Sequence, residues 1–460
     1  MSTTRPPRGP QAARVTVQKQ RKRIAVIGSG VSGLVAARLL SIDHEVTLFE
    51  SADRLGGHTH TVDIELEGRH VAVDTGFMVL NDRTYPNLTR MLELLGLSTQ
   101  DSDMSFSVEC TETGLEYQGS SLNGLFADRA NLLRPSFYRL LRDILRFNRD
   151  VPRLAELETD DLLLGEYLDR SDLGESFVYR YLLPMLGSIW SAPLERVREF
   201  PVLFLGRFMR NHGLAQLKGR PQWKTIPSGA RRYIDRLVEP LGEGVRLSTP
   251  IEQVRRTNDG VWVKPAAHEA ERFDHAVLAV HGPDALRMLE QPTEREQSYL
   301  SAVSYQQNEA VLHTDLRHMP SRSPAWASWN CRVTDDPRQP VSVTYDVNRL
   351  QRHGLAAPLC VTLNPAGPID PAKVLRELQF AHPVYSRGVL AAHEGIRKLN
   401  QSGSVSFCGA WCGYGFHEDG VKSALAVCNR FGRGIEDLKG TEAAQAPATG
   451  SHRGEAIGAS

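Results

Sequence analysis

The sequence predicts an α/β fold in which a doubly wound, mostly parallel sheet is joined to a second, α+β domain that contains an antiparallel sheet. Three observations support this prediction. An apolar strand at 23–27 runs through a glycine turn into an alanine-rich helix at 31–40. A second apolar strand, at 45–49, ends in an acid. Residues 300–365 instead alternate apolar and polar positions, as in VSVTYDV, which is typical of an antiparallel sheet with one solvated face.

The glycine turn predicts a dinucleotide site. Gly28, Gly30 and Gly33 form a G-x-G-x-x-G motif between the first strand and the helix. Such glycines allow a tight turn, close approach of backbone to a pyrophosphate, and close packing of helix on strand. The phosphates would lie at the helix N-terminus, where unpaired N–H groups favour negative charge. Glu50 ends the second strand at the spacing of a ribose-binding acid, which suits FAD and NAD equally and disfavours a 2′-phosphate.

A second glycine turn near the end of the chain favours FAD. Residues 405–408 form an apolar strand, Gly409 opens a glycine-rich loop that can approach a ligand, and Asp419 can cap a helix from Gly420 to about Arg430. A helix N-terminus aimed at a reduced flavin would stabilise its negative charge. We therefore expect one site for a pyrophosphate and another for a flavin.

Composition narrows the class of protein. The chain has 460 residues, 41% hydrophobic and 23% charged, with a formal net charge of zero, so two or three soluble domains are expected and nucleic acid is not an expected partner. The six cysteines show no disulfide or metal pattern, which suits a reducing cytoplasm. We expect no metal site, and no apolar run approaches the roughly 18 residues of a membrane span.

We predict seven consecutive segments along the chain. In order, they are a disordered basic tail (1–22), the first part of the FAD domain (23–97), a mainly helical substrate-domain segment (98–222), the second part of the FAD domain (223–290), the substrate-domain sheet (291–395), the third part of the FAD domain (396–438) and a disordered tail (439–460). Within the second FAD part, three strands are expected at 245–254, 260–264 and 273–280, returning the chain to the nucleotide domain.

A basic amphipathic helix is expected at 134–149. Its apolar side chains share one face, and four arginines lie largely elsewhere. Two interpretations stay open. The helix is either an ordinary domain helix with a solvated basic face or a helix that docks on a membrane surface. We expect the protein to be cytoplasmic, and the second interpretation of the helix would add peripheral contact with a membrane.

Together these motifs resemble the flavin-containing amine oxidoreductase superfamily. The shared pieces are the first glycine motif, Glu50, the Arg54-Leu55-Gly56-Gly57 stretch, Asp74-x-Gly76, Pro227-x-Gly229 and the segment 407–421. Longer stretches, such as DTGFMVLNDRTYPN and FCGAWCGYGFHEDGVKSAL, are similar to the FAD-binding domain of plant cyclopropane fatty-acid synthases and to related bacterial stand-alone flavoproteins. The resemblance spans about residues 23–432. It implies a Rossmann-like FAD domain, a lipid-linked redox role and, as a partner, an acyl-modifying methyltransferase.

The resemblance and the motifs assign site residues. Those expected to bind the cofactor are Gly28, Ser29, Gly30, Gly33, Glu50, Arg54, Gly56, Gly57, Ile251, Gly409, Glu418, Asp419, Gly420 and Val421. Those expected around the substrate are Asn308, Trp326, Trp329 and Tyr414, although the aromatic ones could equally be core residues. His417 is the candidate catalytic acid or base, with a structural role as the alternative.

The chain also departs from the superfamily pattern. Ala410 stands where many members have an acid that meets the ribityl-pyrophosphate, and Asn308 stands where many have a lysine near flavin N5. The missing lysine weakens the case for ordinary amine oxidation. We therefore expect an FAD-dependent oxidoreductase that transfers hydride between flavin N5 and an apolar substrate, a fatty acyl chain of a lipid. The alternatives are an amine or amino-acid oxidase, a carotenoid-type desaturase, or a flavin-bound partner of a methyltransferase without turnover of its own.

Overall fold

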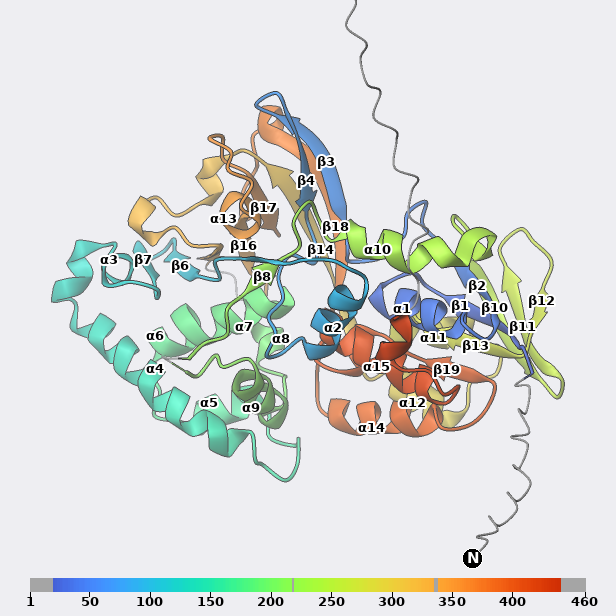
Figure 1. The fold of residues 1–460 in the computed structure, drawn as a ribbon. Helices are drawn as coiled ribbons and strands as arrows, with labels where there is room; N and C mark the ends of the chain where they lie inside the picture. The colour runs from blue at the N-terminus through green and yellow to red at the C-terminus, as the bar shows by residue number, and fades with distance from the viewer. Residues whose placement is uncertain (1–19, 217–218, 335–337, 440–460) are drawn as a thin grey trace, which may run out of the picture.

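The computed structural model describes residues 20–216, 219–334 and 338–439, and it contains two main sheets that lie at opposite sides of the molecule (Figure 1). The first is a five-stranded parallel sheet in the order β19-β13-β1-β2-β9. Its strands are β1 (Arg23–Ile27), β2 (Glu45–Phe49), β9 (Val245–Arg246), β13 (His275–Leu278) and β19 (Val405–Phe407). The predicted doubly wound domain is therefore confirmed.

Helix α1 (Val31–Leu40) is buried along its whole length against this sheet and its neighbours. Its apolar and alanine residues suit a helix covered on several sides. Gly33 permits the close packing, because a Cβ there would come within 1.9 Å of the Gly28 carbonyl oxygen. The other helices around the sheet are α2 (Pro86–Leu94), α10 (Arg231–Val238), α11 (Gly282–Met288), α12 (Glu294–Leu300), α14 (Val389–Leu399) and α15 (His417–Asn429).

The second sheet has seven strands in the order β18-β14-β17-β16-β15-β6-β7. Its strands are β6 (Phe106–Cys110), β7 (Leu115–Gln118), β14 (Ser304–His313), β15 (Trp329–Val333), β16 (Ser342–Asp346), β17 (Cys360–Leu363) and β18 (Val374–Val384). The expected antiparallel sheet is confirmed, with one parallel pair, β15 with β6.

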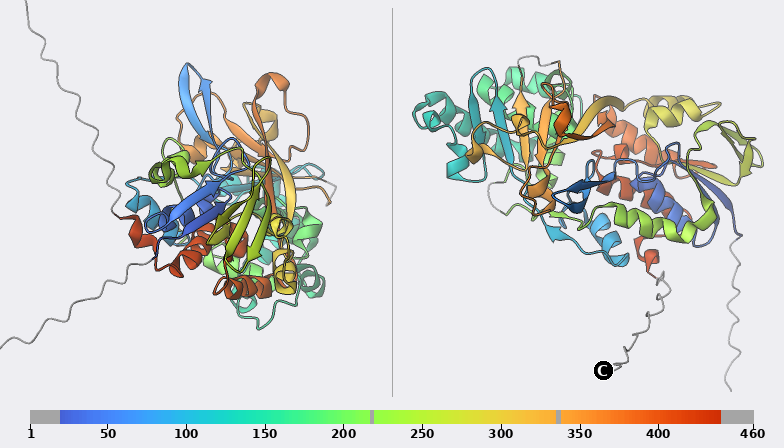
Figure 2. Two further views of the ribbon diagram at one scale, coloured as in Figure 1. Left: turned by 90° about the vertical axis from the view of Figure 1, so that its right-hand side faces the viewer. Right: turned by 90° about the horizontal axis from the view of Figure 1, so that it is seen from above.

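Residues 98–222 are mainly helical but also supply β5 (Gln100–Asp101), β6 and β7. One expectation about the secondary structure is wrong in part. The strands expected to return to the nucleotide sheet do so only in part. Residues 251–273 form a separate antiparallel sheet of β10 (Ile251–Thr257), β11 (Gly260–Pro265) and β12 (Glu271–Phe273), visible at the edge of the molecule opposite α3 (Leu122–Leu125) and α4 (Pro135–Leu154) in Figures 1 and 2.

The remaining elements cover the second sheet or link the two sheets. They are the hairpin β3 (Thr61–Leu66) and β4 (Arg69–Asp74), strand β8 (Lys224–Thr225), helices α3 and α4, α5 (Leu164–Arg170), α6 (Glu175–Phe177), α7 (Leu183–Trp190), α8 (Leu194–Val197), α9 (Val202–Asn211) and α13 (Val347–Gln351). The two tails expected to be disordered lie almost wholly outside the described residues. The domain boundaries stay a prediction.

Candidate cofactor and active site

Four parallel strands of the first sheet deliver loops to one edge. The carboxyl ends of β1, β2, β13 and β19 are followed by Gly28, Glu50, Ala279 and Cys408. Open α/β sheets bind ligands at this edge, where the strand order reverses. Strand β1 is that switch point, since it pairs with β2 on one side and with β13 on the other.

Two glycine loops face each other beside β1. A Cβ on Gly30 would meet no heavy atom within 4 Å, so the space in front of this residue is open. A Cβ on Gly57 would come 3.2 Å from the Gly30 Cα. The Gly56 amide donates to the Ser29 carbonyl at 3.0 Å, which holds the loops together. Because Gly30 provides no side-chain cap for α1, the first N–H groups of the helix are available to an anion.

The two loops around Gly30 and Gly57 form what we call the glycine cradle. Glu50 lies beside it in a fixed orientation. One carboxylate oxygen accepts from the Ser29 amide at 2.9 Å and from its hydroxyl, and the other accepts from the Ala52 amide at 2.9 Å. The Glu50 carbonyl accepts from the Thr249 amide at 2.8 Å, which brings the start of β10 and the buried Ile251 toward the same place. The residues expected at the adenosine end are therefore brought together.

Arg54 bridges the second glycine loop. Its guanidinium donates to the Gly57 carbonyl at 2.9 Å, and partial burial lowers its pKa while Glu50 and Asp53 act in the opposite direction. This places a cation beside the cradle, as a diphosphate requires.

The late glycine turn meets the early one. A Cβ on Gly420 would approach Val31 Cγ1 to 2.6 Å and Ser32 Oγ to 2.9 Å, so α15 and α1 pack with their N-terminal turns in contact. The expected helix start is wrong by three residues, because α15 begins at His417. Asp419 is not the residue before the helix. It lies in the first turn, accepts from the Tyr414 and Phe416 amides, and has its pKa raised by burial to about 6.

Glu418 has a structural task that the sequence did not indicate. Its carboxylate accepts from the Asn87 side-chain amide at 2.7 Å and from the Leu88 backbone amide at 3.0 Å. These groups belong to the first turn of α2, so Glu418 caps that helix. Its side chain is therefore engaged away from the cradle, and only its backbone and that of Gly420 and Val421 keep their predicted role.

A cluster of three half-buried histidines lies next to the glycine loops. His58 follows Gly57, and its ring lies 5.3 Å from that of His382 on β18 and 6.4 Å from that of His281 after β13. Burial, followed by the neighbouring histidines, holds the pKa of His58 well below its usual range. Burial also lowers the pKa of His382 to about 4. His58 Nε2 has no hydrogen-bond partner among the described residues, so a buried polar atom is left for a ligand to satisfy.

Asn308 joins this cluster from β14. Its side-chain nitrogen lies 3.0 Å from His382 Nδ1, and its oxygen accepts from Asn364 at 2.8 Å. Neither His58 nor His382 is among the site residues that the sequence predicts. The signal that could have found them was position, since His58 follows the second glycine loop and His281 follows the carboxyl end of a parallel strand.

His417 lies on the other side of the second glycine loop. It stacks on Phe77 at 3.8 Å, its Nε2 lies 2.8 Å from the Thr59 hydroxyl, and burial lowers its pKa to about 3. At neutral pH it is an uncharged imidazole already hydrogen-bonded to protein. This arrangement favours the structural alternative over an acid or base that titrates near pH 7.

The expected aromatic residues are divided between two places. Tyr414 packs against Phe204 and Phe208 near the start of α15. Trp326 and Trp329 are not gathered with it or with Asn308. Trp329 lies on β15, three strands across the sheet from β14, and the Trp326 indole donates to the Pro320 carbonyl. Among the described residues, no three histidine, cysteine or acidic side chains are placed to hold a metal ion.

An open glycine cradle at the N-terminus of α1, an oriented acid beside it and a second helix N-terminus packed against the first define an enzyme of the dinucleotide-dependent class. These residues fit FAD, because the cradle and Arg54 suit its diphosphate and Glu50 suits its ribose.

Comparisons with known proteins agree. The sequence model of the family described as "Flavin containing amine oxidoreductase" matches residues 31–339. The chain belongs to this family of flavin-dependent oxidoreductases, whose cofactor is FAD. It is 24% identical over 341 residues to the dog protein "Amine oxidase [flavin-containing] A", covering 70% of this chain and 61% of that relative. The chain thus spans about three fifths of the relative's length.

Solved structures share the fold. Cyclohexylamine oxidase from Brevibacterium oxydans superimposes with a TM-score of 0.66 at 16% identity, covering 90% of this chain and all of that one. A structure titled as a CLA-producing fatty acid isomerase from P. acnes superimposes with a TM-score of 0.62 at 14% identity, covering 89% and 98%. No described helix is both long and apolar enough to span a bilayer.

Proposed function

We propose that this protein is an FAD-dependent oxidoreductase that transfers hydride between flavin N5 and a carbon of an unsaturated fatty acyl chain carried by a lipid, while a proton leaves or joins the neighbouring carbon, so that a carbon–carbon double bond forms as the flavin is reduced or is lost as the flavin is oxidised. The observation that carries the proposal is the uncharged lining of the site. His58, His382 and His417 all have lowered pKa values, and Asn308 is an amide on the same sheet face as the cluster.

An uncharged lining suits an apolar chain better than a cationic amine. An ammonium group buried without an anion is costly. Asp284, which reaches His281, is paired with Arg287. Asp419 is half-buried, and its carboxylate accepts from two backbone amides. Tyr414 packs on the buried rings of Phe204 and Phe208, so the protein behind the start of α15 is an apolar core.

The residues divide the work in the following way. The Gly30 and Gly57 loops bind the diphosphate, and Glu50 orients the adenosine end. Bound FAD supplies the acceptor or donor of hydride. His58 Nε2 has no partner among the described residues and is the atom through which this histidine would exchange a proton with a bound molecule. The Asn308 amide keeps His382 in one orientation through their 3.0 Å contact.

The test is anaerobic reduction of the purified yellow protein, followed by its visible spectrum. Vesicles of dioleoyl phosphatidylglycerol should bleach the flavin, and dipalmitoyl vesicles serve as the matched lipid without a double bond. Bleaching by amines but not by either lipid would reject the acyl substrate. Co-purification with an acyl-modifying methyltransferase, with no bleaching by any substrate, would instead support the role of a flavin-bound partner.

Amine oxidation is the second candidate, and it is favoured by the relatives, which are named as amine oxidases. It predicts hydrogen peroxide when the aerobic protein meets primary amines such as benzylamine or putrescine. Absence of peroxide with an amine panel, together with bleaching by dioleoyl lipid, would separate the two candidates.

A further inference from the structure

The helical side of the molecule exposes apolar side chains around the start of α4. Leu132 and Leu133, which precede the helix, are 47% and 88% exposed, and Tyr138 and Leu145 on it are 47% and 42% exposed. Tyr138, Arg142, Leu145 and Arg149 follow one another at helical spacing, so they share one solvent-facing stripe. We call these six residues the α4 face. It lies at the end of the molecule opposite β10–β12 (Figures 1 and 2).

The same segment is strongly basic although the whole chain is neutral. Residues 129–154 contain seven arginines and two acids, Asp143 and Asp150. Asp143 is buried and pairs with Arg142 at 3.3 Å, and Asp172 pairs with Arg146 at 3.3 Å. Within the described parts of the chain, no carboxylate lies within 4 Å of the Arg139 or Arg149 guanidinium. The face therefore combines exposed leucines with the unpaired positive charge of Arg149, and Arg139 on the same helix adds a second.

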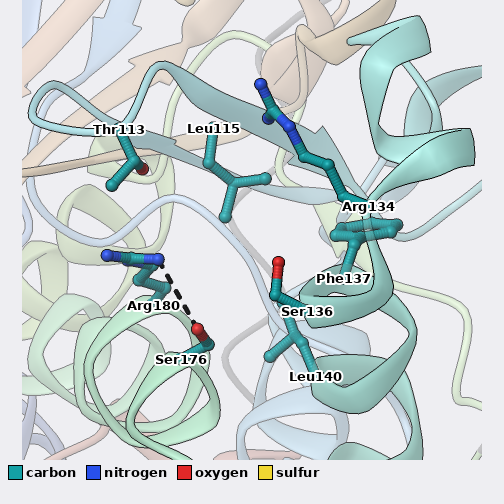
Figure 3. A pocket seen from close by; sticks show the side chains of 8 residues that line it. All are labelled: Thr113, Leu115, Arg134, Ser136, Phe137, Leu140, Ser176 and Arg180. Carbon is teal, nitrogen blue, oxygen red and sulfur yellow. Dashed lines mark hydrogen bonds between the residues drawn. The ribbon is translucent and has the colours of Figure 1, made fainter.

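A pocket of about 270 Å³ opens beside the α4 face (Figure 3). Arg134 and Arg180 line opposite sides of it, and Thr113, Ser136 and Ser176 line it as well, but the Arg134 guanidinium points toward the top of the view, away from Ser136 and Ser176. Arg180 donates to Ser176 at 3.5 Å, whereas Arg134 is paired with Asp128 at 3.0 Å. No carboxylate lines the pocket, and the described residues include none within 4 Å of the Arg180 guanidinium.

The Arg180 guanidinium, which has no carboxylate partner among the described residues, and the three hydroxyls around the cavity are donors suited to a phosphate. Leu115, Phe137 and Leu140 line the rest of the cavity, which suits the apolar part of a larger molecule. Arg134 and Ser136 directly follow Leu133 in the chain. A phosphate in the pocket and an acyl chain against the leucines would therefore lie side by side, as the headgroup and the acyl chains do in a lipid layer. A soluble phosphate ion would leave the leucines exposed, and a second copy would bring like-charged faces together.

We propose that the α4 face and this pocket dock the protein on an anionic phospholipid surface, with a lipid phosphate at the Arg180 side of the pocket and with Leu132 and Leu133 in the acyl boundary. The arrangement has the two parts of an interfacial anchor, an apolar edge and a basic flank. The inference deepens the proposed lipid function by naming where the lipid layer is met. The test below measures only vesicle binding. Vesicle binding can therefore be absent while lipids still reduce the flavin, and it can be present while they do not.

The experiment is co-sedimentation of the full FAD-loaded chain with vesicles. Binding to vesicles of 30% dioleoyl phosphatidylglycerol in phosphatidylcholine should be at least tenfold tighter than to phosphatidylcholine alone and should weaken with salt. Arg180→Gln should weaken it roughly fivefold, the effect of one surface arginine. The double variant Leu132→Ser, Leu133→Ser should weaken it at least tenfold.

Matched controls lie on the other domain. Leu247→Ser removes a leucine that is 41% exposed, and Arg236→Gln removes an exposed arginine of α10, so both should bind like the unmodified protein. Equal binding to the two vesicle types, or equal losses in test and control variants, would overturn the proposal. Displacement by millimolar inorganic phosphate without any effect of the leucine variant would show a soluble phosphate site instead. Concentration-dependent dimerisation that needs Leu132 and Leu133, without vesicle binding, would show a contact between copies.

Discussion

At the scale of single residues, Gly30 is where the cradle can be closed without disturbing the fold. Its φ of −62° is open to any residue, and a Cβ there meets nothing within 4 Å. Gly30→Val should therefore fold with nearly the melting temperature of the cofactor-free parent protein but lose FAD, measured as absorbance near 450 nm per protein. Gly119→Val, at another open glycine away from the cradle, is the control and should stay yellow. A fully yellow Gly30→Val variant would contradict the placement of the diphosphate.

His58 provides a test of the histidine cluster. His58→Phe keeps a ring against Phe380 and His382 but removes the unpartnered Nε2. We expect it to retain FAD and to slow anaerobic flavin reduction by 10²-fold or more, the usual range for loss of a proton-transfer group. His268→Phe changes an exposed histidine and should reduce at the parent rate. An unchanged rate in His58→Phe would leave this cluster with a packing role only.

Asp74 should make stability depend on pH. It is 1% exposed, accepts from the Thr61 hydroxyl at 2.6 Å and the Ala230 amide at 2.9 Å, and burial raises its pKa to about 7. Since the unfolded chain holds this proton only below about pH 4, the free energy of unfolding should fall as pH rises from 4 to 7, by at most roughly 4 kcal/mol. Asp74→Asn should flatten that slope in urea melts, whereas Asn at the exposed Asp63 should not.

At the scale of elements, contact between α1 and α15 depends on Gly420. A side chain there would press on Val31 and Ser32, so Gly420→Val should lower the free energy of unfolding by about 1–3 kcal/mol. Gly434→Val is the control, because its nearest neighbouring atom is 4.0 Å away. Equal urea midpoints for the two variants would show that the helix starts are not tightly packed.

Element starts also show where sequence reasoning reaches its limit. The strand, glycine turn and helix at 23–40 were predictable because every local signal agrees. The start of α15 was not, because Asp419 satisfies the Phe416 amide from inside the helix rather than from the capping position. The carboxylate of Glu418 was assigned to the cofactor, but it caps α2 more than 300 residues earlier in the chain, a contact only the tertiary fold creates.

At the scale of the whole molecule, both sheets were predictable, but their membership was not. Strands β6 and β7 come from a segment with mostly helical patterning and complete a sheet built from 304–384. The histidine cluster is likewise assembled from segments far apart in the sequence. His58, His281 and His382 meet only because β13 and β18 end near the second glycine loop. Non-local pairing of this kind leaves no periodic signal in one sequence.

The same long-range assembly predicts how the intact chain responds to its cofactor. Residues that would hold FAD come from the loops after β1, β2 and β9 and from the start of α15, so binding should stabilise the whole fold rather than one segment. FAD at one hundred times its dissociation constant should add about 2.7 kcal/mol and raise the melting temperature of cofactor-free protein by about 3 °C. FMN at the same concentration lacks the adenosine that Glu50 and the Ile251 region are placed to hold, so its shift should be much smaller. An equal shift with FMN would mean that the Gly30 cradle and Glu50 contribute little to binding, and the cofactor would then have to be held by the α15 end alone.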